Sequence, residues 1–339
     1  MEPRSPQTLL RQVRAGVSAT TAAAVLCAAL TACAGGISTR TSRIGVDDGT
    51  DPCRREAVAL DSSGDFFTED ILKGAVIGML GGAAVGGIAG QGWRGALLGA
   101  GAGAAVGAAT GYWAALQRQG REQEELLDRV RRDLTRENAE IDRIQIAYDA
   151  LADCRFRKAQ SIRTAYAQRQ IPREAAVAQM EQVRTQAQRD IQLARLISGK
   201  IAERGVQLEI AAENLSPGTQ RAIEHSRSVQ LRPAVVHTST PLKLRPADSS
   251  VDVASLRGNE RVRVIAIPGR HAVVETDRGE RGYVPLSVLD GMAPDAGQSM
   301  ASDGAIRTLA GSNAARRDDF AASVAVTEQA TARQLTLED

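Results

Sequence analysis

Apolar residues recur every seven positions between Trp113 and about Gln170. Two interleaved series share this spacing, namely Leu127, Leu134, Ile141 and Tyr148, and Val130, Ile144 and Leu151, with Glu137 filling the gap in the second. A seven-residue apolar repeat with charged flanks is typical of a coiled-coil seam. The pattern therefore predicts one long amphipathic helix that ends at Ile171-Pro172.

A second apolar stripe begins after Pro172, a residue that is favoured in the first turn of a helix. Its members recur mostly at steps of three and four: Val177, Met180, Val183, Ala187, Ile191, Ala194, Ile197, Ile201 and Leu208. The stripe ends before Ser216-Pro217-Gly218. Because neither stripe can stay exposed to water, residues 114–214 are predicted to form a long antiparallel coiled-coil hairpin.

The period changes to two after a linker that is predicted to span residues 215–234. Short alternating segments lie at 235–236, 242–246, 262–267, 272–274 and 282–284, with Pro268-Gly269 and Arg278-Gly279 as turns. Five such strands predict a small all-β barrel over residues 235–290. Residues 291–339 are rich in Ala, Gly, Ser, Thr and Asp, so we expect a disordered tail apart from one marginal helix near 318–335.

Glycines recur every fourth residue in two runs that precede the helical region. The runs are Gly74, Gly78, Gly82, Gly86 and Gly90, and then Gly95, Gly99, Gly103, Gly107 and Gly111. Residues four apart share one helix face, and in water each glycine costs about 1 kcal/mol relative to alanine. In lipid, close packing of small residues holds helices together. The ladders therefore predict a membrane hairpin over residues 73–113, which packs on itself or on another membrane protein.

This ladder resembles the glycine-zipper two-helix module of outer-membrane lipoproteins, the group that includes the rickettsial 17 kDa surface antigen. Each segment is close to the ~20 residues that a membrane span needs, and Trp93, Tyr112 and Trp113 would mark the membrane interfaces. A nucleotide-binding glycine loop does not fit, because Val106 stands at its third glycine and no strand precedes it. A flexible Gly/Ala linker is the remaining alternative.

The N-terminus has the pattern of an export signal. Arg4, Arg11 and Arg14 precede an apolar stretch over residues 15–30, which is short for a membrane span. The stretch closes with Leu30-Thr31-Ala32-Cys33, which resembles the lipobox of bacterial lipoproteins. The resemblance implies cleavage of residues 1–32 and acylation of Cys33 with fatty acids such as palmitate. An ordinary signal peptide and an uncleaved anchor are the alternatives.

By the same resemblance, Ala34 after the acylated cysteine favours the outer membrane, with the protein facing the periplasm. The inner membrane is the alternative location. Residues 33–72 are polar and rich in turn residues, so we interpret them as a tether.

Two cysteines remain after the signal and the lipidated residue are set aside. Cys53 lies in the tether and Cys154 in the first long helix. Pairs of thiols in an oxidising periplasm tend to be bridged. The part of the tether from Cys53 to Lys73 can stretch about 65 Å, and Cys154 lies about 60 Å along the helix from Trp113. A disulfide is therefore within reach, and two free thiols or an intermolecular bond are the alternatives.

The predicted β module resembles the bacterial SH3 domain. Residues 242–246 stand at one of its characteristic strands, Leu256-Arg257-Gly258 at its turn, and Gly282-Tyr283-Val284 at its aromatic strand. The family binds cell-wall peptides or protein partners, and the resemblance suggests a contact patch of Arg245, His271 and Tyr283. His271 replaces the usual tryptophan, which puts the usual groove in doubt. Alternatively, Tyr283 and Arg245 only hold the barrel together.

The amino-acid composition and the net charge argue against several classes of function. Hydrophobic residues make up 43% of the 339 residues but aromatics only 3%, which argues against a large enzyme core. The net charge is +2 with interleaved signs, so we expect no nucleic-acid partner. No metal spacing joins His225, His237 and His271, and no catalytic motif is present. We therefore predict no catalytic residue, no metal and no cofactor.

These patterns together predict a multi-domain α + β protein that is not an enzyme. It would be a structural lipoprotein with acyl chains and a glycine-zipper hairpin in membrane lipid. Its helical hairpin would act as a spacer, and its SH3-like module would be offered to peptidoglycan or an envelope protein. The alternative is an oligomeric channel built from copies of the glycine-zipper hairpin.

Overall fold

The computed structural model describes residues 40–75, 105–118, 122–230, 233–292 and 305–337. The chain divides into two units, and the first, which ends at Asp48, contributes the short helix α2 (Arg40–Ile44). All other described elements belong to the second unit. Its helices are α3 (Arg54–Ala75), α5 (Ala105–Arg118), α6 (Gln123–Ala167), α7 (Arg173–Leu215), α8 (Thr219–Gln230) and α9 (Ile306–Gln334).

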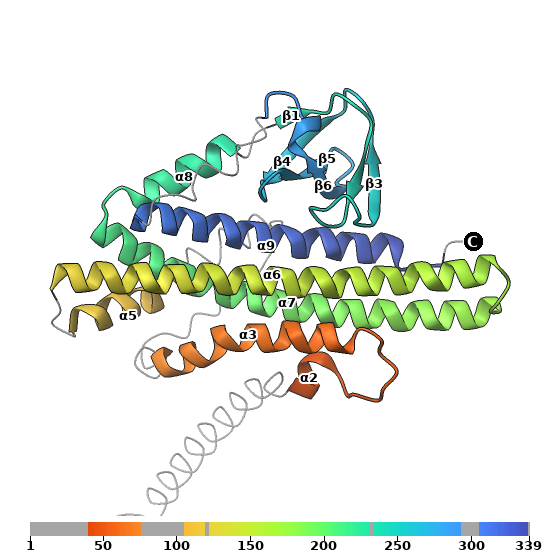
Figure 1. Ribbon diagram of the computed structural model, residues 1–339, viewed down its shortest axis with the longest axis horizontal. Coiled ribbons are helices and arrows are strands. Elements are labelled where there is room, and N and C mark those ends of the chain that lie inside the picture. The colour runs from red at the N-terminus through yellow and green to blue at the C-terminus, as the bar shows by residue number, and fades with distance from the viewer. Residues whose placement is uncertain (1–39, 76–104, 119–121, 231–232, 293–304, 338–339) are drawn as a thin grey trace, which may run out of the picture. The chain divides into compact units, whose positions relative to one another are not determined.

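The two predicted long helices are present as α6 and α7, which pack against each other (Figure 1). A short turn joins them, with Arg169 in the left-handed region at φ 55°. The seven-residue repeat of α6 is buried at Val130, Leu134, Ile141 and Leu151, as the pattern predicted. In the second stripe Val177 is the exception, because 45% of it is exposed.

The tail was predicted to be disordered apart from one marginal helix near 318–335, and its helix is longer than predicted. α9 is a helix of 29 residues that packs along both α6 and α7 (Figure 1). Its contact positions are small: Ala310, Ala314, Ala322 and Ala330 are buried. Small side chains let helices approach closely, but they leave no stripe of large apolar residues for a sequence pattern to reveal.

Two other segments are more ordered than predicted. Part of the tether is α3, which packs against α6 and α7, and part of the linker is α8, which packs against α9. In α3 the side chain of Leu60 is fully buried, and the ring of Phe66 lies 4.8 Å from the guanidinium carbon of Arg136. Tertiary contacts of this kind stabilise helices whose local pattern is weak.

The β region forms one antiparallel sheet of six strands in the order β1-β4-β5-β6-β2-β3. The strands are β1 (Pro233–Val235), β2 (Thr240–Lys243), β3 (Asp252–Leu256), β4 (Arg261–Ala266), β5 (His271–Thr276) and β6 (Arg281–Pro285), followed by the 3₁₀ turn η1 (Leu286–Val288). The predicted five-strand closed barrel is wrong in two respects. β3 was missed, because its sequence Asp-Val-Ala-Ser-Leu alternates weakly, and β1 and β3 are the two ends of an open order.

The sheet has two covered faces. One face encloses its own cluster around Val236, Leu242, Val264 and Val284. The other face carries Val273 and Tyr283 into a shared core with α6, α7 and α9. In Figure 1 α9 lies between the sheet and the two long helices. The β module is therefore joined to the helices by a continuous core.

The predicted membrane elements fall mostly outside the described residues. Cys33 and seven of the ladder glycines, namely Gly78, Gly82, Gly86, Gly90, Gly95, Gly99 and Gly103, lie there. Gly74 belongs to α3, and Gly107 and Gly111 belong to α5. Within the residues that the structure describes, no helix combines the length and the apolar character that a membrane crossing requires.

Candidate functional site: a cavity between the sheet and the helices

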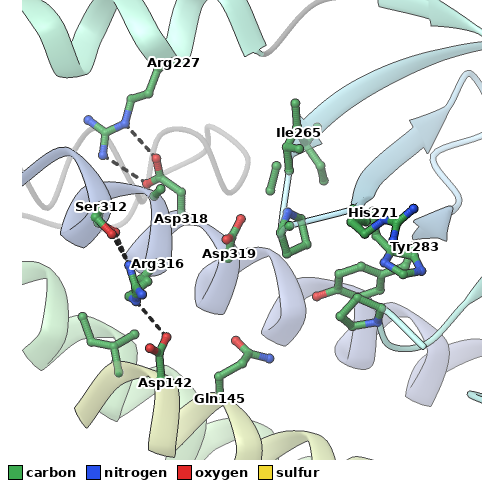
Figure 2. A pocket seen from close by; sticks show the side chains of 18 of the residues that line it. Asp142, Gln145, Arg227, Ile265, His271, Tyr283, Ser312, Arg316, Asp318 and Asp319 are labelled. Carbon is green, nitrogen blue, oxygen red and sulfur yellow. Dashed lines mark hydrogen bonds and ion pairs between the residues drawn. The ribbon is translucent and has the colours of Figure 1, made fainter. Parts of the chain in front are cut away.

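A cavity of about 600 Å³ lies where the sheet meets the helices (Figure 2). Helices α6, α8 and α9 contribute side chains to its wall, and so do β6 and the turn between β4 and β5. Its size is within the range of small-molecule sites. The charged and polar residues of its wall are Asp142, Gln145, Ser226, Arg227, Arg270, His271, Tyr283, Ser312, Arg316, Asp318 and Asp319.

Two ion pairs hold the helical side of the cavity together. Nε of Arg316 lies 2.8 Å from Oδ1 of Asp142, which joins α9 to α6. Nε of Arg227 lies 2.7 Å from Oδ2 of Asp318, which joins α8 to α9. Figure 2 draws both pairs as dashed lines. Each of these arginines is thus already engaged with a carboxylate.

Asp319 differs from its neighbours. Its carboxyl group has no hydrogen-bond or ion-pair partner among the described residues, and in Figure 2 no dashed line reaches it. Burial raises its pKa to about 8, and the negative charges of Asp318 and Asp142 add to this effect while Arg316 opposes it. The side chain of Asp319 is only partly buried, so its unpaired carboxyl group is accessible from the cavity.

The sheet side of the cavity is mainly apolar. Ile265 and Ile267 are buried, and Pro246 and Pro268 extend the same wall. His271 begins β5 beside them and is partly exposed. Burial lowers the pKa of His271, so the neutral imidazole is favoured at neutral pH. Among its described residues, the cavity therefore combines an apolar wall with Asp319, an acid that pairs with no side chain, and with the exposed Arg270 of the β4–β5 turn.

The predicted contact patch of Arg245, His271 and Tyr283 is not one surface. Tyr283 is only 1% exposed and belongs to the core under the sheet. Nε of Arg245 donates to Oδ1 of Asp153 in α6 at 2.5 Å, so it fastens the sheet to the helices. His271 and Tyr283 both line the cavity, whereas Arg245 does not. The buried Tyr283 and the paired Arg245 fit the alternative in which these two side chains have a structural role, although here they hold the sheet on the helices.

The acidic residues of the cavity were missed. Asp318 and Asp319 lie at the start of the marginal helix that was predicted near 318–335, within the actual helix α9. The local run Arg316-Arg317-Asp318-Asp319 resembles any solvated stretch of mixed charge, so no sequence signal distinguished Asp319. Tyr112 and Trp113, which were predicted to mark a membrane interface, are partly buried and pack against the cluster that contains Leu134 and Leu208.

A second site joins the tether region to the helices. Cys53 and Cys154 form the disulfide that was considered, with their Cα atoms 5.8 Å apart. Beside it, Nη1 and Nη2 of Arg155 donate to the carboxylate of Asp51, at 2.5 Å and 2.9 Å. Nε of Arg155 donates to Oδ2 of Asp190 in α7 at 2.6 Å. We call Asp51, Cys53, Cys154, Arg155 and Asp190 the clamp.

The charged groups of the clamp lie away from bulk solvent, so each is stabilised by a partner of opposite charge. Desolvation raises the pKa of Asp190, and the adjacent Arg155 opposes that shift. The two carboxylates raise the pKa of Arg155 against the effect of burial. The clamp thus contains one guanidinium between two acids.

No cluster of three or more His, Cys, Asp or Glu side chains suitable for a metal ion occurs in the described part of the chain. The cavity and the clamp are therefore the candidate functional sites within the described residues. Comparison with known proteins adds no further guide: no protein-family model, no curated protein and no solved structure matches this chain.

Proposed function

We propose that this protein is a non-enzymatic lipoprotein of the bacterial envelope, which links the outer membrane to the cell wall or to other envelope proteins. Cys33 would carry the acyl chains, and the mature protein would face the periplasm. An SH3-like β module, held on the helices, would be the part offered to peptidoglycan or to a protein partner.

The observation that carries this proposal is the clamp. A lipid anchor can fix the position of the folded protein relative to the membrane only if the chain that follows the lipid is attached to the folded protein. Here that chain is joined covalently to α6 through Cys53 and Cys154. It is joined again by the ion pairs of Arg155 with Asp51 and Asp190. Breaking a buried ion pair by removing one partner typically costs about 3–5 kcal/mol, so this attachment is strong.

The chain length from the lipid to the clamp sets the reach of the tether. Cys53 lies 20 positions after Cys33. At about 3.3–3.6 Å per residue, these positions span at most about 70 Å. An acylated Cys33 would therefore keep the clamp within that distance of the membrane. A bridged cysteine pair is also typical of exported proteins, which supports a periplasmic location.

The arrangement of α3 and α5 supports a glycine-zipper membrane hairpin. These helices flank residues 76–104, and both pack against α7. Leu116 of α5 is buried in the cluster that contains Leu208 of α7. Both ends of the glycine-rich segment thus belong to one folded body, as a hairpin that leaves and re-enters it would require. The hairpin would provide a second attachment to lipid, to another copy or to a different membrane protein.

The way the sheet is attached supports a rigid scaffold. Arg245 pairs with Asp153 of α6, and the backbone N–H of Arg281 donates to Oε1 of Gln329 in α9 at 2.6 Å. A partner that binds the β module would therefore be held at a defined position relative to the clamp. The long helices would set that spacing.

Incorporation of labelled palmitate tests the lipid anchor. We expect labelling of the wild-type protein, loss of labelling in Cys33→Ser, and full labelling in Cys27→Ser, the matched control inside the signal. Lipoprotein anchoring is contradicted if wild type incorporates no palmitate or if Cys33→Ser incorporates as much as wild type. Ion conductance by the purified protein in planar bilayers would instead favour the channel alternative, which the glycine ladders suggested.

A further inference from the structure

We propose that the cavity between the sheet and α9 binds a ligand that carries a primary ammonium group on an aliphatic chain, with Asp319 as the counter-ion. The inference does not depend on membrane attachment, because every residue that it uses lies in the described cavity wall. It assigns a ligand class to a site for which the sequence provided no motif.

The first argument is the state of the charges in the cavity. Arg316 and Arg227 are paired with Asp142 and Asp318 at 2.8 Å and 2.7 Å. The positive charges of the two helices are therefore already used, and Asp319 stays without a partner among the described residues. A cation that entered the cavity would find one available carboxylate. Ionised hydrogen bonds are roughly twice as strong as neutral ones.

The second argument is the shape and polarity of the opposite wall. Ile265, Ile267 and Pro268 lie across from the acidic side and present apolar surface. The volume of about 600 Å³ exceeds what a bare metal ion or a single ammonium group would fill. A ligand with a methylene chain would bury that chain against the isoleucines, at about 0.8 kcal/mol per methylene. A lysine side chain or an aliphatic diamine has this form.

The titration of Asp319 predicts a specific pH dependence for the affinity of the ligand. The charged groups that shift its pKa are Asp318 and Arg316 on α9 and Asp142 on α6. The other titratable or charged groups that line the cavity are Arg227 on α8, Arg270 in the β4–β5 turn, His271 on β5 and Tyr283 on β6. The pKa of about 8 for Asp319 means that the free protein carries a proton there at neutral pH. An ammonium ligand requires the ionised form, so binding should release this proton. Affinity should rise about tenfold per pH unit below the pKa and level off above it.

Isothermal titration calorimetry on the purified full-length chain tests this proposal. The probes are Nα-acetyl-lysine amide and 1,5-diaminopentane, which represent a peptide-borne and a free amine, and Nα-acetyl-norleucine amide, which lacks the ammonium group. We expect at least one amine to bind at pH 8, at least tenfold more tightly than the norleucine probe. Its affinity should fall about tenfold between pH 7 and pH 6.

Variants separate the carboxylate from the rest of the fold. Asp319→Asn should weaken amine binding at least tenfold at pH 8 and abolish its pH dependence. It should fold, because an amide replaces a carboxyl group that is neutral at pH 7. Asp277→Asn removes an exposed acid from the β5–β6 turn and should bind like wild type. Ala315→Phe adds bulk at the cavity wall without changing charge, and it should also weaken binding.

The proposal is overturned if neither amine binds the wild-type chain. Equal affinity of wild type and Asp319→Asn would overturn it as well, and so would equal binding of the lysine and norleucine probes. A thermal unfolding curve for each variant confirms that a loss of binding is measured on folded protein.

Discussion

Glu137 occupies an apolar position of the α6 repeat, and its side chain is fully buried. It pairs with Arg204 of α7, and burial raises its pKa to about 7. Nearby, Arg317 of α9 pairs with Glu209 of α7. Charged residues inside a helical core specify which helices pack together and in which register. At the residue scale, then, α9 is held by a specific buried pair as well as by its alanines.

Substitutions at two glycines of α7 test the pair of Arg317 with Glu209, one as the test and one as its control. A Cβ atom at Gly205 would collide with the guanidinium of Arg317, whereas a Cβ at Gly199 would meet no atom within 4 Å. Because Arg317 is buried and paired, we expect Gly205→Ala to lower the free energy of unfolding by about 1–3 kcal/mol. Gly199→Ala should raise it by up to about 1 kcal/mol through helix propensity. Chemical denaturation measures both, and a stabilising Gly205→Ala would contradict the packing described.

At the scale of elements, α9 connects the long helices α6 and α7 to the β-sheet. Its alanines lie against α6 and α7, and on its other side Ala322 and Val326 share a core with Val273 and Tyr283 of the sheet. Gln334 near its end donates to the carbonyl oxygen of Val253 in β3 at 3.0 Å. This edge strand is therefore partly covered, which limits pairing with other chains.

Truncation tests the importance of α9. A chain that ends at residue 304 would expose the apolar faces of α6, α7 and the sheet that α9 covers. We expect loss of cooperative thermal unfolding and rapid cleavage by protease within residues 233–292. A chain that ends at Leu337 keeps all of α9 and serves as the control. If the shorter chain unfolded at the wild-type temperature, α9 would be a peripheral helix.

At the scale of the whole molecule, one covalent bond joins segments that are distant in sequence. Cys53 and Cys154 are 101 positions apart, and the loop between them contains the whole glycine-rich region. Closing a loop of this length removes much of the freedom of the unfolded chain. The clamp therefore stabilises the attachment of the predicted tether and also the folded body.

Removing the disulfide should lower stability substantially. For the double variant Cys53→Ser/Cys154→Ser we expect a loss of about 2–5 kcal/mol in the free energy of unfolding, since loop-closure entropy scales with loop length. Treatment of wild type with dithiothreitol should give a similar loss, while the double variant should not respond to it. A wild-type chain whose melting temperature is unaffected by the reductant would show that the bond is absent or contributes nothing.

The sequence by itself determined the two long helices and most strands, because large apolar residues at helical or strand spacing must be buried wherever the chain folds. Val130, Leu134 and Ile141 illustrate this for α6. The same spacing arguments brought Cys53 and Cys154 within reach of each other. They predicted only a marginal helix near 318–335 where the structure has α9. Most buried residues of α9 are small or polar, and the larger apolar ones are Ile306, Phe320, Val324 and Val326. Small residues carry little apolar signal, and their burial depends on a partner helix.

Only the tertiary structure decided which polar and charged side chains are buried, which are paired, and which have a shifted pKa. Tyr283 and Arg245 have the local pattern of surface residues on a β module, yet packing against α6 and α9 buries the first and pairs the second. Asp319 has an ordinary sequence context and acquires its raised pKa from the walls of a cavity formed by distant segments. Burial and electrostatic environment are properties of neighbours in space, so a chain pattern cannot specify them.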